Sequence, residues 1–351
     1  MTEYSFEKKI EGRPLHIAKK RDFMMDNVKA LLLFLVAFGH TLDVYKGSGG
    51  VELYIMKYIY LFHMPLFAFI TGYFTKNFER ARETAVEKCL MPYLIFQGVY
   101  VIMANVMIYA GLASFNSDVF NSSILIPSSA FYYLLAVFFW KIFAKDIMRV
   151  KYPLILAVLL GLTISLTKMD SFHIGYGAAF SLLPFFVLGV ICDSEHISRI
   201  RQMPKWIAVV ALAAGVIPAV YLPYAIHSVR MTYASAEFGD IEGIVYRLIF
   251  YITAVIMGAA IICLMPRKET FISNIGKASI LVYAGSTFLA PHGYVLIDKI
   301  CRLSGNRIMN MTGMIIYCMC LVLFCSIPLF LKWYNHILGM LNKWIFKGDE
   351  R

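Results

Sequence analysis

Long apolar runs separated by short polar segments dominate the 351 residues of this chain. A helix needs about 20 mostly apolar residues to cross the hydrocarbon of a bilayer, and it satisfies its own backbone polar groups there. The candidate spans are 27–45, 52–74, 89–111, 130–145, 152–167, 175–192, 206–222, 243–265, 278–297 and 312–334. The fourth and fifth are short, and two alternatives stay open for them: a merged pair or a re-entrant segment. The pattern predicts an all-α polytopic integral membrane protein with about ten transmembrane helices.

Positive side chains alternate between successive loops. With ten spans, 24 of the 33 Lys and Arg residues fall at the two ends and in every second loop, and only six fall in the alternate loops. Cytoplasmic loops carry the excess of Lys and Arg in membrane proteins. We therefore expect both termini in the cytoplasm and a multi-pass protein of the cell (inner or plasma) membrane. The expected organisation is a basic cytoplasmic segment at 1–25, one membrane domain at 26–335 and a cytoplasmic tail at 336–351.

Composition excludes several other classes. Hydrophobic residues make up 60% of the chain and charged residues 16%, whereas soluble domains contain about a quarter charged residues. The net charge of +11 follows the loops, which favours membrane lipids over nucleic acid as the partner. The polar, basic first 25 residues contain no signal peptide, so the first span is expected to direct insertion. Seven cysteines without a C-x-x-C pair predict neither a metal site nor a disulfide framework.

Four ionisable residues occur in or at the first span, namely Asp26, Lys29, His40 and Asp43. Eleven steps of 100° separate Lys29 from His40, which is three turns plus about 20°. The two aspartates lie three residues to either side, so all four are expected on one stripe of one helix. Ionisable groups in the hydrocarbon are costly and usually face a cavity or a partner. A basic group near the cytoplasmic end and an imidazole about 16 Å further along the axis would suit an anionic substrate that enters from the cytoplasm.

His63 lies about eleven residues from the outer end of the second span, so it is expected at a depth similar to that of His40. Structural explanations also exist for these polar residues. Asp26 and Lys29 would serve as a solvated pair at a helix start, and His63 would satisfy backbone carbonyls that Pro65 leaves free. Arg247, early in the eighth span, is expected to extend its charged end to the outer surface.

Five short blocks carry a resemblance to a known family. They are RDFMMDNVK at 21–29 followed by GHT at 39–41, YLFHMPLFAFITGY at 60–73, LMPYL at 90–94, LPFFVLG at 183–189 and GKAS at 276–279. Their order and spacing resemble the membrane acyltransferase-3 family, in particular the branch described as fucose 4-O-acetylase-like. That family has a basic residue and a histidine with ten positions between them, which Lys29 and His40 match. The resemblance extends over residues 20–335.

The resemblance implies transfer of an acyl group, usually acetyl from acetyl-CoA, to a hydroxyl of a carbohydrate. The donor would be cytoplasmic and the acceptor extracytoplasmic. His40 is the expected general base, since an imidazole is neutral yet basic at cellular pH. Asp43 or Asp26 would orient it, and His63 would lie beside it. Direct transfer and a covalent acyl-histidine intermediate both stay open. The expected partners of the CoA phosphates are the basic residues Lys29, Arg80, Arg82 and Lys88.

The chain departs from the family pattern at two places. The family often has a histidine just after the block that runs from Gly276 to Tyr283, where this chain has Ala284, Gly285 and Ser286, and His292 is no obvious replacement. It also often has W-F-L ahead of the fourth span, where 131–134 read FYYL. A transporter or lipid-linked sugar flippase is the main alternative, although no internal repeat supports it. A non-catalytic module is a second alternative. The acceptor, the acyl group and the oligomeric state are open, because small-residue patches are common in all membrane helices.

Overall fold

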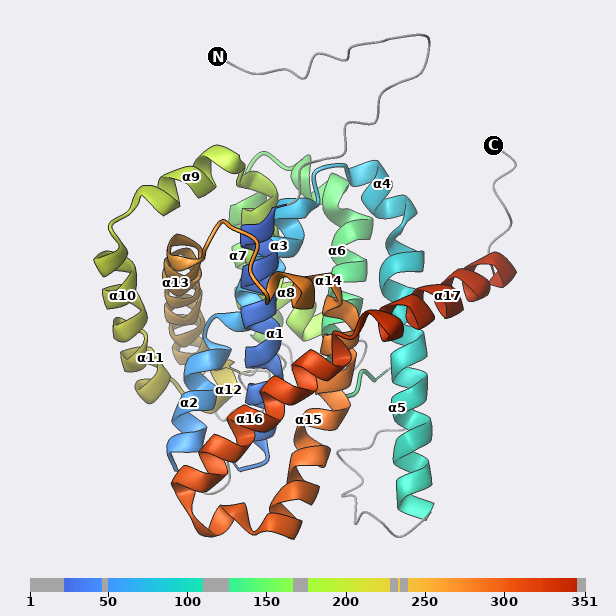
Figure 1. Ribbon diagram of the computed structural model, residues 1–351. Coiled ribbons are helices and arrows are strands. Elements are labelled where there is room, and N and C mark those ends of the chain that lie inside the picture. The colour runs from blue at the N-terminus through green and yellow to red at the C-terminus, as the bar shows by residue number, and fades with distance from the viewer. Residues whose placement is uncertain are drawn as a thin grey trace.

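The computed structural model describes residues 22–45, 50–109, 126–166, 176–227, 233 and 239–345, and within these ranges the chain is helical, without β-strands. The α-helices are α1 Phe23–Asp43, α2 Val51–Tyr60, α3 His63–Phe74, α4 Phe78–Glu83, α5 Met91–Tyr109, α6 Tyr132–Met148, α7 Pro153–Thr163, α8 Tyr176–Ile191, α9 Ser194–Gln202, α10 Lys205–Ala214, α11 Val216–Tyr221, α12 Tyr224–His227, α13 Asp240–Leu264, α14 Ser273–Lys277, α15 Ser279–Cys301, α16 Arg307–Cys325 and α17 Pro328–Ile345. They form a bundle (Figure 1), so the all-α prediction is confirmed for this part of the chain.

The protein is a multi-pass membrane protein. Among the described residues, six helical stretches are long and apolar enough to cross a bilayer: α1, Val51–Phe74, Val86–Val106, α13, α15 and α16. A seventh arises if α8 and α9, bent by 97° at their junction, count as one span. The apolar stretches Pro153–Leu166 and Lys205–Tyr221 are shorter. Ten spans and two cytoplasmic ends therefore stay predictions. Residues 1–21 and 346–351, with most of the terminal segments predicted above, lie outside the described residues.

Helix α1 lies in the middle of the bundle. It packs against α2, α3, α14, α15 and α16 (Figure 1). Its buried residues include Met25, Ala30, Leu33, Phe38 and Leu42, which at 100° per residue point in several directions around the axis. A helix that is apolar on all sides is stable only when other helices or lipid surround it. The polar stripe of α1 is therefore held inside the protein.

The tightest helix pair joins α3 to α8 through two glycines. A Cβ built on Gly72 would lie 1.9 Å from the carbonyl oxygen of Phe186, and a Cβ on Gly189 would lie 2.0 Å from the carbonyl oxygen of Phe69. Only glycine permits such an approach of two backbones. Each helix thus presents its glycine to the other's backbone, which fixes the position of α3 and of His63 at its first turn.

The second predicted span, 52–74, is broken in the middle. Helix α2 ends at Tyr60 and α3 begins at His63. Pro65 explains the break, because it has no N–H and its ring clashes with the carbonyl of the residue four positions earlier, here Leu61. The break leaves His63 at the start of a new helix, inside the bundle.

The last predicted span, 312–334, is wrong as a single helix. Helix α16 ends at Cys325 and α17 begins at Pro328, a residue that favours a helix start. None of the residues of α17 is buried. One stripe of it is apolar and exposed: Leu329, Trp333, Ile337, Met340 and Trp344. This pattern is typical of helices that lie in the membrane interface. The predicted tail boundary at 336 falls inside α17.

Basic side chains bind free carbonyls at helix ends. Lys76 donates to the carbonyls of Gly189, Val190 and Cys192 at the end of α8, at 2.6–3.1 Å. Arg201 donates to Ile262 and Met265 at the end of α13. The prediction for Arg247 is wrong: none of its side chain is exposed, and it donates to the carbonyl of Ile226 at 3.0 Å. Helix α12, which contains Ile226, and the side chain of Tyr233 pack against α13 beside this residue.

Candidate functional site

The ionisable stripe of α1 begins with an ion pair. The Nζ atom of Lys29 lies 3.6 Å from a carboxylate oxygen of Asp26, which is buried. The same ammonium group lies 4.7 Å from the centre of the Phe74 ring, at the end of α3. A quarter of the Lys29 side chain is exposed, so this residue is neither fully solvated nor fully buried. Because a quarter of the side chain is exposed, this charge remains accessible to an anion.

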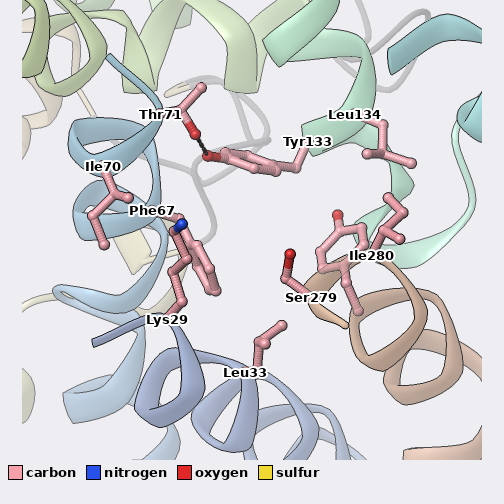
Figure 2. A pocket seen from close by; sticks show the side chains of 10 residues that line it. Lys29, Leu33, Phe67, Ile70, Thr71, Tyr133, Leu134, Ser279 and Ile280 are labelled. Carbon is pink, nitrogen blue, oxygen red and sulfur yellow. Dashed lines mark hydrogen bonds between the residues drawn. The ribbon is translucent and has the colours of Figure 1, made fainter. Parts of the chain in front are cut away.

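A cavity of about 170 Å³ opens beside Lys29, between α1, α3, α6 and α15 (Figure 2). We call it cavity 1. Its walls are mainly apolar and are formed by Leu33, Phe67, Ile70, Leu134, Ile280 and Tyr283. Its polar groups are the ammonium of Lys29, the hydroxyl of Ser279, which points into the cavity in Figure 2, and the Thr71–Tyr133 pair. An apolar cleft with a few convergent polar groups is the usual form of a small-molecule site.

Hydrogen bonds fix the tyrosines of cavity 1. The hydroxyls of Thr71 and Tyr133 lie 2.8 Å apart and join α3 to α6. The hydroxyl of Tyr283 donates to the carbonyl of Ala130, which ties α15 to the start of α6. Side chains locked in this way hold a cavity open without a ligand.

A second cavity, of about 390 Å³, adjoins the first. Cavity 2 is formed by the segment around Lys88 and Pro92 and by one face of α17: Glu87, Lys88, Pro92, Ile280, Tyr334, Asn335, Leu338, Gly339 and Asn342. The side chain of Ile280 lines both cavities. Helix α17 is attached here by a bond from Asn342 to Glu87 at 2.9 Å and by the stacked rings of Phe96 and Tyr334.

The structure separates the four basic residues predicted to bind the donor. Lys29 lines cavity 1 and Lys88 lines cavity 2, so these two lie on either side of Ile280. Arg80 and Arg82 are exposed on α4 and line neither cavity. A positive charge in α4 thus has a position typical of an ordinary cytoplasmic loop residue.

Asn27, next to Asp26, was missed in the sequence. It is fully buried, and its amide nitrogen donates to the carbonyls of Pro266 and Lys268, both at 3.1 Å. Its amide oxygen accepts from the hydroxyls of Thr270 and Ser273. One side chain of α1 thereby holds the segment that leads into α14 and on to Ser279. The only sequence signal was an amide at the start of the first predicted span.

Replacement of Asn27 by alanine is expected to lower the free energy of unfolding by about 2–4 kcal/mol, because two carbonyls and two hydroxyls would lose a buried partner. Thermal unfolding of the purified protein measures this loss. Asn105→Ala is the matched control, since Asn105 bonds only to Val101 of its own helix. Equal destabilisation by both changes would contradict the structural role of Asn27.

The two predicted histidines meet at the other end of the stripe. His40 and His63 lie within electrostatic range of each other. The ring of His63 packs on that of Tyr60, with 4.9 Å between the ring centres. Its Nδ1 lies 2.9 Å from the carbonyl oxygen of Ile59, which requires a proton on Nδ1 in the neutral ring and leaves the lone pair on Nε2. His63 thus both satisfies a carbonyl at the helix break and offers a basic nitrogen.

Asp43 connects this pair to α12. One of its carboxylate oxygens accepts a bond from the hydroxyl of Tyr224 at 3.2 Å, and Asp43 also lies within electrostatic range of Tyr60. The four stripe residues therefore form two groups: Asp26 with Lys29 beside cavity 1, and His40 with Asp43 near His63, Tyr60 and Tyr224. Among the described residues, no three His, Cys, Asp or Glu side chains gather so as to hold a metal ion.

A family model described as "Acyltransferase domain" matches residues 24–332 of this arrangement. The chain belongs to the acyltransferase-3 family. The match includes α1 to α16 and the start of α17, so it contains both cavities' bundle-side walls and both histidines.

Two nodulation proteins NolL are similar to part of this acyltransferase-3 chain. The protein of Sinorhizobium fredii (strain NBRC 101917 / NGR234) is 36% identical over 88 residues, and that of Mesorhizobium japonicum (strain LMG 29417 / CECT 9101 / MAFF 303099) is 35% identical over 85 residues. The aligned part is 22% of this chain in both cases, and 24% and 23% of the relatives. The chain thus spans about a quarter of the length of these curated relatives. No solved structure matches it.

The acyltransferase-3 blocks in the sequence converge in space. The first block supplies Lys29 and the last supplies Ser279, both in cavity 1. The L-M-P-Y block supplies Pro92 to cavity 2. The two blocks that contain Gly72 and Gly189 form the contact between α3 and α8. The blocks therefore combine residues that line the site with residues that hold the helices around it.

The residues that replace the frequent late histidine of the acyltransferase-3 family have structural roles here. The hydroxyl of Ser286 donates to the carbonyl of Tyr283 at 2.9 Å, within its own helix. His292, further along α15, packs its ring on Phe288, which in turn contacts Tyr100 of α5. His292 thus belongs to the aromatic packing between α5 and α15.

Proposed function

We propose that this acyltransferase-3 protein transfers an acyl group, most directly acetyl, from acyl-CoA at the cytoplasmic face to a hydroxyl of an extracytoplasmic carbohydrate. The observation that carries the proposal is the arrangement along α1. Lys29 opens on a cavity with apolar walls, and His40 lies eleven residues further along the same helix, beside His63. This helix therefore connects a place for an anionic, partly apolar donor with a pair of potential bases.

The two adjoining cavities match the two parts of an acyl-CoA. Its phosphates need cationic partners, which Lys88 and Lys29 offer in cavities 2 and 1. The narrow, largely apolar cavity 1 suits the chain that ends in the thioester. In this arrangement the donor passes Ile280, which lines both cavities.

In the proposed reaction, His40 takes the proton of the acceptor hydroxyl while the hydroxyl oxygen attacks the thioester carbonyl. The new C–O bond forms, the C–S bond breaks, and CoA leaves as a thiolate that later takes up a proton. The Tyr224–Asp43 bond holds Asp43 one turn from His40, in a position to orient it. His63 is the second base candidate, because its Nδ1–H is held by a backbone carbonyl.

The donor site is tested by the Michaelis constant for acetyl-CoA. Lys29→Gln is expected to raise this constant about tenfold, because one charge-assisted contact to the donor is lost. Labelled acetyl transfer in membranes that contain the protein and a carbohydrate acceptor is the measurement. Ile280→Trp is expected to block transfer, because the larger side chain would fill the space at the residue that lines both cavities, where the donor is proposed to pass.

Arg82→Gln is the matched control and is expected to leave the constant unchanged, since Arg82 lines neither cavity. An equal rise in Arg82→Gln would favour phosphate binding on the exposed face of α4 instead. If neither the natural protein nor any variant transfers labelled acetyl although acceptor is present, the acyltransferase proposal fails. A flippase then becomes the better explanation.

A further inference from the structure

Arg247 of α13 is a buried charge without a carboxylate partner among the described residues. The hydroxyl of Tyr233 lies beside its guanidinium group, and the centre of the Phe250 ring lies 5.7 Å from its Cζ atom. None of its side chain is exposed, and its Nη1 donates to the carbonyl of Ile226 at 3.0 Å. Its Nε and Nη2 atoms have no hydrogen-bond partner. Among the described residues, none of the ion pairs includes it. A fixed charge buried in this way is among the costliest groups that a membrane protein can contain.

His227 connects Arg247 with a second buried cation, Lys57. Lys57 of α2 is buried, and its Nζ donates to the carbonyl of Val220 at 3.0 Å. His227 of α12 is also buried and lies within electrostatic range of both Lys57 and Arg247. We call these three residues the Arg247 cluster. A basic side chain from α2 and one from α13 thus lie within electrostatic range of His227, and no described carboxylate pairs with either.

His227 adds an acceptor to the cluster. Burial, reinforced by the two neighbouring cations, lowers the pKa of His227 to about 4, so its ring is neutral at cellular pH. Its Nδ1 lies 2.9 Å from the carbonyl oxygen of Pro223 and therefore carries the proton. Its Nε2 then bears a lone pair, and this atom has no hydrogen-bond partner. A hydroxyl group of a ligand would satisfy it.

The free atoms of Arg247 have a specific geometry. Nε and Nη2 lie on the same edge of the guanidinium plane, with N–H bonds that point the same way. This edge matches the two oxygens of a carboxylate or phosphate in a bidentate pair. The hydroxyl of Tyr251, one turn further along α13, lies within electrostatic range of Arg247 and also lacks a partner.

The Arg247 cluster is linked to the histidine pair through two helices. Lys57 lies one turn before Tyr60 on α2, and the Tyr60 ring packs on His63. His227 lies one turn after Tyr224 on α12, and Tyr224 binds Asp43. A ligand that is held at Arg247 would therefore extend towards the side chains proposed for catalysis.

We propose that Arg247, together with Lys57 and His227, binds an acidic group of the carbohydrate acceptor, a carboxylate or a phosphate. This proposal rests on the proposed function, because the carbohydrate is an acceptor only if the protein transfers an acyl group. It assigns the substrate class as an acidic sugar, whose charged group pairs with the free edge of Arg247 and whose hydroxyl donates to Nε2 of His227.

Substitutions at position 247 can distinguish anion binding from a purely structural role. The bond to the Ile226 carbonyl needs only a neutral donor, which glutamine supplies. Arg247→Gln therefore keeps a donor at this position and removes the charge. Arg247→Lys keeps the charge and removes the bidentate edge.

The test measures binding in the absence of CoA. The purified full chain in detergent micelles is heated with glucuronate, glucose 1-phosphate or glucose, at equal concentration and with ionic strength held constant by sodium chloride. The two acidic sugars are expected to raise the midpoint of unfolding, and glucose is not. Arg247→Gln is expected to weaken this binding about tenfold or more, and Arg247→Lys less. Arg199→Gln, a change in an exposed arginine of α9, is the control and is expected to keep the full shift.

An unchanged shift in Arg247→Gln, or no shift of the natural protein with either acid, overturns the proposal. If phosphatidylglycerol in the micelles raises the midpoint of unfolding and the acidic sugars do not, the Arg247 cluster binds a lipid phosphate. That result also overturns the proposal. If Arg247→Gln fails to fold, Lys57→Gln takes its place and is expected to weaken the acidic sugars alone. Labelled acetyl transfer is measured separately. If no acetyl is transferred but the acidic sugars still raise the midpoint of unfolding, the proposed function fails and the anion site remains.

Discussion

Replacement of His40 by alanine is expected to lower the rate of acyl transfer by about 10²–10⁴-fold, the usual contribution of a positioned general base. His40 is half-buried on α1, within electrostatic range of His63 and one turn from Asp43. Without the imidazole, the acceptor hydroxyl has no neutral base at that point of α1 to take its proton. The measurement is the rate of labelled acetyl transfer to carbohydrate in membranes with equal amounts of each variant.

His63→Ala is the informative comparison for His40→Ala. His63→Ala removes the hydrogen bond to the Ile59 carbonyl. This variant is therefore expected to lose thermal stability as well as activity. His40→Ala is expected to lose activity while its unfolding midpoint stays close to that of the natural protein. Equal labelling by His40→Ala and the natural protein would support acyltransferase activity but contradict the role of His40 as the general base.

Replacement of Gly72 by alanine is expected to prevent α3 and α8 from packing in their present positions. The added Cβ would lie 1.9 Å from a backbone oxygen of Phe186 and 3.0 Å from the backbone nitrogen of Val190. No side-chain rotation relieves a clash with backbone, so the two helices must separate. We expect an unfolding midpoint too low for the protein to be purified intact, or a loss of about 3 kcal/mol or more if it is.

Gly98→Ala provides the control for this change. Gly98 lies within α5, and a Cβ at that position meets no atom within 4 Å. Alanine is the better helix former, so this variant is expected to be as stable as the natural protein or slightly more so. Full stability of Gly72→Ala in the same measurement would contradict the close contact between the two helices.

The long spans could be predicted from the sequence because their signal is local. Continuous apolar stretches such as those of α1, α13 and α15 define a helix without knowledge of its neighbours. The breaks after Tyr60 and after Cys325 were not predicted, although Pro65 and Pro328 mark both. Hydropathy averages over a window of about 19 residues and so cannot separate two helices joined by only two residues.

The site could be predicted only along single helices. The stripe on α1 follows from 100° per residue, and the depth of His63 from 1.5 Å per residue. The contributions of Ser279, Thr71 and Tyr133 to cavity 1 depend on which helices are neighbours, and no local pattern contains that information. Arg247 was misjudged for the same reason, because the sequence does not show that α12 and Tyr233 pack beside it.

Helix α17 gives one of the cavities an unusual wall. One side of cavity 2 belongs to the bundle, and the other is α17, which runs across the outside of the bundle (Figure 1) and exposes the apolar stripe of Trp333, Ile337 and Trp344. We therefore expect the lateral pressure of the lipid headgroups to act more directly on the α17 wall than on the bundle wall. The width of the cavity would then depend on the surrounding leaflet as well as on the polypeptide, and we expect it to differ between a bilayer and a detergent micelle.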